Sequence, residues 1–120
     1  MVLHKQIENI EATAQKAGKG VSMKMLLSPD ESPNFAMRNF IIEAGGHMPL
    51  HTNSVEHEQF VLSGRAKVVL GDKTIEAKAG DVLLIPAGVA HSYETIGDAP
   101  YSFLCLVPKG DDKIEILTSC

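Results

Sequence analysis

Apolar and polar residues alternate in short runs along most of the chain, and each run ends at Gly, Pro, Asp or Ser. Short alternating runs bounded by turn-forming residues are typical of β-strands. The pattern predicts strands at 21–27, 35–43, 58–62, 66–70, 74–77, 82–85, 91–95 and 101–107. Turns are expected at 28–30, 45–46, 71–72, 79–81 and 97–100. Only the segment 6–16 is a helix candidate, and its apolar periodicity is thin.

Short strands at a spacing of about 8–12 residues are typical of a sandwich or a barrel. The run 82–85 is apolar at every position, which suits a strand buried between two layers. Closure of the sheet into a jelly-roll would remove its exposed edges. The sequence therefore predicts an all-β fold of the barrel type.

Length and composition narrow the class of protein. The chain has 120 residues, enough for one domain, with 44% hydrophobic and 22% charged residues and a net charge of −4. The sequence holds no Lys/Arg cluster, so we expect no nucleic-acid partner. It also holds no apolar run of the ~20 residues that a membrane span needs, and its N-terminus resembles no signal peptide. We expect a soluble, cytoplasmic protein with no membrane partner.

The cysteines are too few for a disulfide framework, and they lie in no paired zinc spacing. Cys105 falls in an apolar strand, where a buried, reduced thiol is expected. Cys120 is the last residue and is expected to be exposed.

Three of the five histidines fall in a regular spacing with glycines and a proline. His4 lies near the N-terminus and His47 follows two glycines, so both are expected outside any site. The first spaced motif consists of Gly45, His51, Asn53, His57 and Gly64. The second motif consists of Gly80, Pro86, Gly88, His91 and Thr95.

In these two motifs the chain resembles the cupin superfamily, and specifically its small single-domain members. The resemblance covers about residues 34–108 and implies a double-stranded β-helix barrel there, with residues 1–33 packed outside it. Asn53 stands where the family has a second histidine, and His57 stands where it has a glutamate. The first motif is nearest to a subgroup that binds metal through four histidines. Small cupins commonly pair, so the resemblance also implies a homodimer.

The ligand chemistry is consistent with that resemblance. His51 and Asn53 lie two positions apart on extended chain, so their side chains share one face. Imidazoles at His51, His57 and His91 suit a divalent transition metal such as Fe, Mn, Zn, Ni or Cu. Asn53 is either a weak ligand, a hydrogen-bond partner beside the metal, or a plain turn residue. The alternative is that the histidines only pack or form hydrogen bonds.

Alternation also predicts the wall of a substrate pocket. Tyr93 shares a strand face with His91, and Gln59 shares one with His57. Phe103 and Cys105 share another face, as pocket wall or as ordinary barrel core. Arg38 stands in an apolar strand, where it either binds an anionic substrate or is exposed.

Three functions remain open from the sequence. The leading hypothesis is a metal-dependent enzyme of the dioxygenase type, acting on a small organic substrate, because three histidines leave coordination positions open. The second is a metal-dependent sugar or keto-acid isomerase or lyase, in which Tyr93 or a metal-bound hydroxide moves the proton. The third is a non-catalytic module that binds or senses a small molecule, because fold alone does not decide function.

Overall fold

The computed structural model describes residues 2–117 as one curled antiparallel sheet. The first elements are the 3-10 helix η1 (Ile7–Asn9) and the short strand β1 (Thr13–Ala14). The remaining strands are β2 (Lys19–Leu27), β3 (Phe35–Asn53), β4 (His57–Ser63), β5 (Arg65–Leu70), β6 (Lys73–Lys78), β7 (Val82–Ile85), β8 (His91–Ile96), β9 (Tyr101–Pro108) and β10 (Ile114–Ile116). The all-β prediction is confirmed, and each predicted strand coincides with one of these elements or with part of one.

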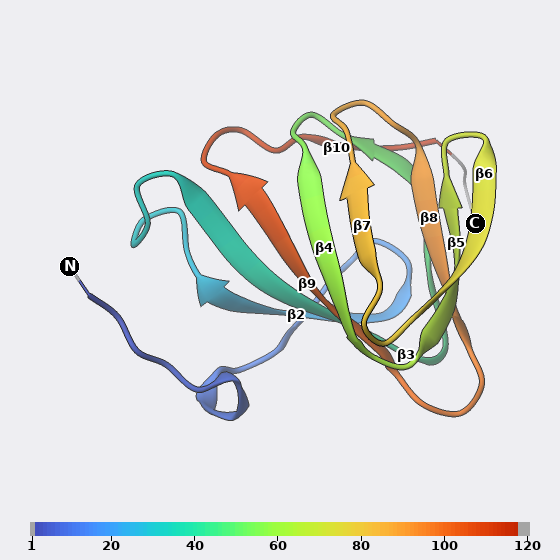
Figure 1. Ribbon diagram of the computed structural model, residues 1–120, viewed down its shortest axis with the longest axis horizontal. Coiled ribbons are helices and arrows are strands. Elements are labelled where there is room, and N and C mark those ends of the chain that lie inside the picture. Colours follow the sequence, from blue (N-terminus) through green and yellow to red (C-terminus); the bar gives the residue numbers. More distant parts are fainter. Residues whose placement is uncertain (1, 118–120) are drawn as a thin grey trace.

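The strands follow the order β6-β5-β8-β3-β9-β4-β7 around the sheet, which curls into a barrel (Figure 1). β3 lies at its centre. The first half of β3 pairs with β9, from Phe35 opposite Pro108 to Ile42 opposite Tyr101. Its second half pairs with β8, where His51 lies opposite His91. One strand thus links both sides of the barrel and carries two of the predicted ligands.

The predicted turn at residues 45–46 is wrong, because β3 runs through both glycines. Gly45 has φ +79°, a conformation open to glycine at little cost. The partner strand β2 pairs Lys19 with His47 and Val21 with Ile42, so the register shifts here as in a β-bulge. The glycines therefore bend β3 without ending it.

The helix candidate at 6–16 is also wrong. That segment contains only η1, which buries no residue, and β1, which pairs with β2. Its few apolar residues could not cover the core with a helical face. β2 lies within the segment expected outside the barrel, yet it pairs along β3 and extends the sheet.

Side-chain alternation separates the barrel interior from its surface. β8 and β9 bury every second residue, and Tyr101, Phe103 and Cys105 point inward on β9. The prediction that the apolar run 82–85 is buried on both faces is wrong, because Val82 and Leu84 are exposed on the outer face of β7. The interior is not uniformly apolar, because five polar side chains that we expected at a site are also buried: His51, Asn53, His57, Gln59 and His91. Burying a polar side chain costs free energy unless it forms hydrogen bonds, so each of these side chains needs a partner or a ligand inside the barrel. Among residues 2–117, no helix is long and apolar enough to cross a membrane.

Candidate metal centre and pocket

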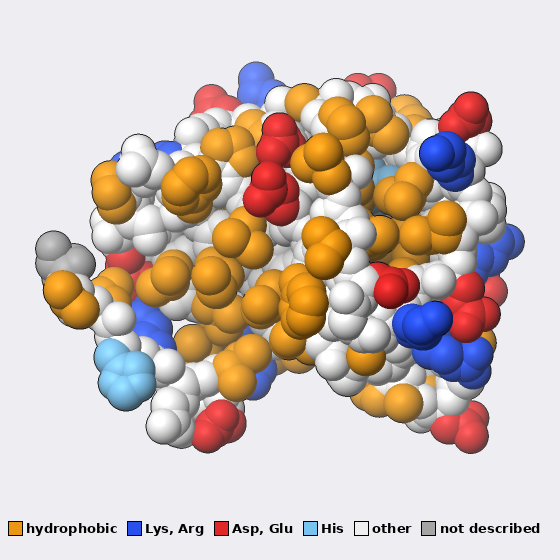
Figure 2. Space-filling model, viewed as in Figure 1, with side chains coloured by type: hydrophobic (Ala, Val, Ile, Leu, Met, Phe, Trp, Pro, Cys, Tyr) orange, Lys and Arg blue, Asp and Glu red, His pale blue; other side chains and the backbone are white. Residues whose placement is uncertain are grey.

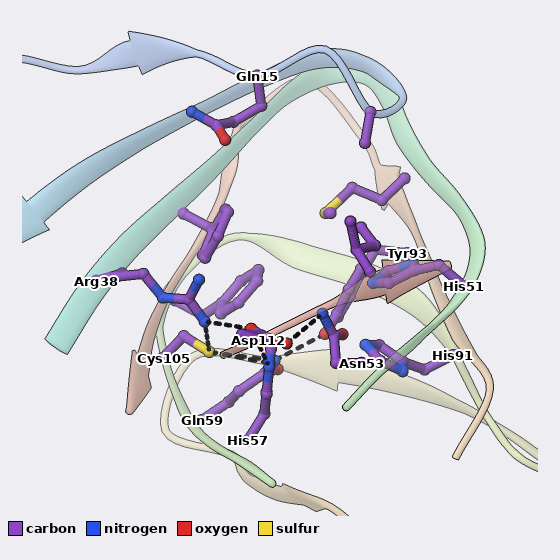
Figure 3. Close-up of a pocket in the computed structure, with 15 residues that line it drawn as sticks. Gln15, Arg38, His51, Asn53, His57, Gln59, His91, Tyr93, Cys105 and Asp112 are labelled. Carbon is purple, nitrogen blue, oxygen red and sulfur yellow. Dashed lines mark hydrogen bonds and ion pairs between the residues drawn. The ribbon is translucent and has the colours of Figure 1, made fainter. Parts of the chain in front are cut away.

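The buried polar residues line one cavity of about 210 Å³ inside the barrel (Figure 3). Every residue that the sequence predicted for the site lines it: Arg38, His51, Asn53, His57, Gln59, His91, Tyr93, Phe103 and Cys105. The other lining residues are Gln15, Ala17, Phe40, Met48, Asp112 and Ile114. His4 and His47 do not line the cavity. Glu56 and Glu58, which flank His57, are exposed.

His51 and His91 are held in the same way. Nδ1–H of His51 donates to the Pro49 carbonyl at 2.7 Å, and Nδ1–H of His91 donates to the Val89 carbonyl at 2.9 Å. Each ring therefore keeps Nε2 as its free nitrogen, and the ring centroids lie 4.1 Å apart. Burial lowers the pKa of His51 and lowers that of His91 to about 4. Both imidazoles are neutral at pH 7, which is the form that binds metals.

His57 is held differently, by a carboxylate and a thiol. Its Nε2–H donates to Oδ2 of Asp112 at 3.1 Å, and its Nδ1 lies 3.4 Å from the Cys105 sulfur. Burial alone would lower the pKa of His57, but these two partners raise it to about 9. His57 is therefore protonated at pH 7 in this arrangement.

Asn53 points toward the same carboxylate. Its Nδ2 donates to Oδ1 of Asp112 at 3.2 Å, while its Oδ1 is buried and has no hydrogen-bond partner among the described residues. A buried amide oxygen without a donor is uncommon in a stable fold. This oxygen therefore remains available to a ligand, a water molecule or a metal ion.

Arg38 lies within the cavity wall. Its Nη2 is 3.8 Å from Oδ2 of Asp112 and 3.5 Å from the Cys105 sulfur, and the guanidinium lies over the Phe40 ring at 5.1 Å. Burial raises the pKa of Cys105, but His57 and Arg38 outweigh burial and lower it overall. Cys105 is buried and free, as predicted, whereas Cys120 lies outside the described residues.

Tyr93 forms the cavity wall beside the histidines. Its hydroxyl accepts a hydrogen bond of 2.7 Å from Nε2 of Gln59, and its ring stacks on Phe103 at 5.2 Å. Burial raises the pKa of Tyr93 well above its usual value, so the phenol stays neutral. A neutral phenol donates a proton or a hydrogen bond but does not act as a base at pH 7.

Asp112 is the site residue that sequence reasoning missed. It follows the last predicted strand and lies four residues after Pro108, in a stretch without alternation. No feature of the sequence distinguishes it from the neighbouring Asp111. Only the tertiary fold brings Asp112 against His57, Asn53 and Arg38.

The donor types fit a transition metal, but their arrangement is incomplete. Within residues 2–117 no three His, Cys, Asp or Glu side chains are already gathered closely enough to hold an ion. His51 and His91 present free Nε2 atoms, whereas His57 is bonded to Asp112. A metal here requires His57 to exchange that hydrogen bond for coordination, which ties metal binding to release of a proton.

Comparison with known proteins agrees with this architecture. Residues 38–107 match the family model described as a cupin domain. The chain is 38% identical over 86 residues to mannose-1-phosphate guanylyltransferase 2 of Escherichia coli O157:H7, covering 70% of this chain but only 17% of that enzyme. It is 29% identical to the uncharacterized protein MJ1618 of Methanocaldococcus jannaschii, covering 82% of each.

A solved structure is similar over the whole chain. It is the polyketide cyclase RemF from Streptomyces resistomycificus, with a TM-score of 0.90, 25% identity and coverage of 100% of this chain and 88% of the other. The curled antiparallel barrel and the two motifs that face its cavity agree with the family match. The chain therefore belongs to the cupin superfamily, as a small cupin barrel.

Proposed function

We propose that this cupin is a metal-dependent enzyme acting on a small organic molecule, with the metal held by His51, His57 and His91. The support is chemical. Two of these imidazoles are neutral and offer free Nε2 atoms, and the third lies in the same cavity. Asn53 offers an unpartnered amide oxygen as a weaker donor. The bound metal would serve as a Lewis acid for an oxygen atom of the substrate.

The reaction class that the cavity supports best is carbonyl chemistry. Tyr93 already accepts a hydrogen bond from Gln59, and its hydroxyl has no other partner within residues 2–117. Its own O–H is therefore free to donate to a substrate oxygen that gains negative charge. The Arg38 guanidinium, on the opposite side of the cavity in Figure 3, would attract the same developing charge. The observation that carries this proposal is the Tyr93 hydroxyl, which accepts a hydrogen bond from Gln59 and keeps its own O–H for the substrate.

The apolar residues that line the cavity support an apolar or aromatic substrate. Phe40, Met48 and Phe103 form an apolar part of its wall, beside the polar side chains of the site. The similarity to a polyketide cyclase supports the same class, since ring closure in a polyketide joins carbons activated by neighbouring carbonyl groups. Isomerisation, lyase or ring-closing reactions of a carbonyl compound all use this combination of groups.

Oxygenation is the second candidate. Three histidines and one weak amide donor leave open positions at a metal, where dioxygen and a chelating substrate could bind together. In that case the metal would be Fe, Mn or Cu, because Zn lacks redox chemistry. The same residues would hold it, and Tyr93 would orient the substrate.

Both candidates can be tested on one metal-loaded sample. Pyruvate and 2-hydroxyacetophenone serve as carbonyl probes in D2O without oxygen, and NMR follows deuterium uptake at the methyl group beside each carbonyl. Carbonyl chemistry predicts metal-dependent uptake that falls about 100-fold in Tyr93→Phe. A parallel aerated portion of the sample is followed with an oxygen electrode, and oxygen consumption there without deuterium uptake in the anaerobic portion would favour the oxygenase. Binding of a probe without either reaction would favour a sensor module.

We further propose a homodimer. Large apolar side chains are exposed on the outer face of β4 and β7, and Figure 2 shows apolar groups spread over this side of the molecule. Phe60 and Val82 lie opposite each other there, with 43% and 75% of their surface exposed. A second copy placed face to face would cover these side chains. Light scattering should give a dimer for the wild type and a monomer for Val82→Glu.

A further inference from the structure

The segment that follows β9 crosses one end of the barrel and is fixed there by backbone contacts. We call residues 109–117 the C-terminal strap. Ser54 holds its middle: the Ser54 hydroxyl donates to the Asp111 carbonyl at 2.7 Å and accepts from the Lys113 amide at 2.7 Å. β10 then pairs with residues 51–53 of β3. Asp112 lies between the two anchored residues, so its side chain has a defined position at the cavity.

Two candidate ligands point at the Asp112 carboxylate from different sides. His57 donates to Oδ2 at 3.1 Å, and Asn53 donates to Oδ1 at 3.2 Å. The carboxylate thus lies where the free ends of these two side chains meet (Figure 3). A metal ion bound by Nε2 of His57 would occupy the place of the proton that His57 now donates, next to an oxygen of Asp112.

The charges in the cavity favour a carboxylate ligand. Asp112 is the one carboxylate among the residues that line the cavity, and Arg38 is the one Lys or Arg. A divalent ion bound by neutral imidazoles alone would leave two positive charges buried beside that guanidinium. Uncompensated buried charge is costly, and an anionic oxygen in contact with the ion reduces the cost. Asp112 carries this compensating charge.

We propose that Asp112 is a metal ligand, delivered to the strand-borne histidines by the C-terminal strap. The inference rests on the metal site of the proposed function and adds a donor that neither sequence motif contains. No strand contributes a carboxylate to the cavity, because Asp112 is the one acidic residue among those that line it. Asp112 supplies that carboxylate from another part of the chain.

The test uses the full-length, metal-free protein and compares Asp112→Asn with Asp111→Asn. Asp111 is the matched control because it is exposed and contributes only its backbone carbonyl to the strap. Zinc affinity is measured by competition with a chelator, and the visible spectrum of the Co²⁺ form reports the ligand set. Asp112→Asn should weaken zinc at least 10-fold and alter the Co²⁺ spectrum, whereas Asp111→Asn should change neither.

A second variant separates coordination from loss of structure. Ser54→Ala removes the hydroxyl anchor of the strap but keeps every proposed donor, so it should weaken zinc less than Asp112→Asn and leave the Co²⁺ spectrum unchanged. Unaltered affinity in Asp112→Asn would overturn the proposal. Weaker binding with an unaltered Co²⁺ spectrum would also overturn it, because Asp112 would then only orient His57. A wild type that binds neither zinc nor cobalt would instead overturn the metal-dependent function itself.

Discussion

The Asp112 carboxylate lies 3.1 Å from Nε2 of His57, although 55 positions separate the two residues in the chain. This contact joins the C-terminal strap to β4, the strand that begins at His57. The contact also helps to raise the pKa of His57, whereas burial lowers the pKa of His91. Two histidines of one cavity therefore carry different charges at neutral pH.

The stability of the metal-free protein should depend on this pair. The pKa of His57 is about 9 in the folded chain against 6.5 when unperturbed, so the contact stabilises the fold fully below pH 6.5. That contribution is lost as the pH rises from 6.5 to about 9. The free energy of unfolding, measured with urea at several pH values in this range, should therefore decrease more with rising pH for the wild type than for Asp112→Asn. Equal decreases in the two proteins over this range would contradict the assigned contact.

Two glycines provide a matched test of the fold. A Cβ at Gly64 would collide with the carbonyl oxygen of Pro100, whereas a Cβ at Gly71 would meet only a Val89 methyl group at 3.6 Å. Both residues have positive φ, so alanine costs about 1–2 kcal/mol of strain at either. Gly64→Ala adds a backbone collision of about 1–3 kcal/mol more. Thermal unfolding should therefore show a clearly larger loss for Gly64→Ala. Equal losses would show that the backbone at Gly64 does not lie this close to Pro100.

Cys105 should react slowly although its pKa is lowered. The residue is 0% exposed, so a thiol reagent reaches it only when the barrel opens. In a Cys120→Ser variant, labelling by a disulfide reagent should be slow in buffer and complete within seconds in urea. Native labelling as fast as that of a free thiol would mean that β9 is not packed inside the barrel.

Asn53→His tests the position at which this chain departs from the four-histidine subgroup. The new imidazole would share the strand face of His51 and is a better donor than an amide oxygen for these metals. We expect tighter metal binding together with slower turnover, because the added ligand fills an open coordination position. Unchanged affinity in a chelator competition would place residue 53 outside the coordination sphere. Tighter binding at full activity would mean that the open position does not serve the reaction.

The sequence predicted the barrel because alternation and turn residues are local signals, and strands such as β5 and β6 follow that alternation in the structure. It also predicted which residues face the cavity, since His51, His57 and His91 lie on inward positions of their strands. The continuity of β3 could not be predicted, because Gly45 and Gly46 are turn residues in isolation and only the pairing of β3 with β2 and β8 holds the strand through them. Asp112 could not be predicted either, because its position depends on Ser54, far away in the chain.

The central claim is that His51, His57 and His91 together hold a divalent metal. The most direct test is calorimetric titration of the metal-free protein with zinc, alongside His51→Ala, His57→Ala, His91→Ala and the control His47→Ala. His47 lies on β3 but does not line the cavity, so its loss should leave the site intact. We predict one zinc ion per chain in the wild type and in His47→Ala, and a loss of affinity of at least 10-fold in each of the other three variants. Zinc binding that survives all three substitutions, or that is lost equally in His47→Ala, would contradict the account.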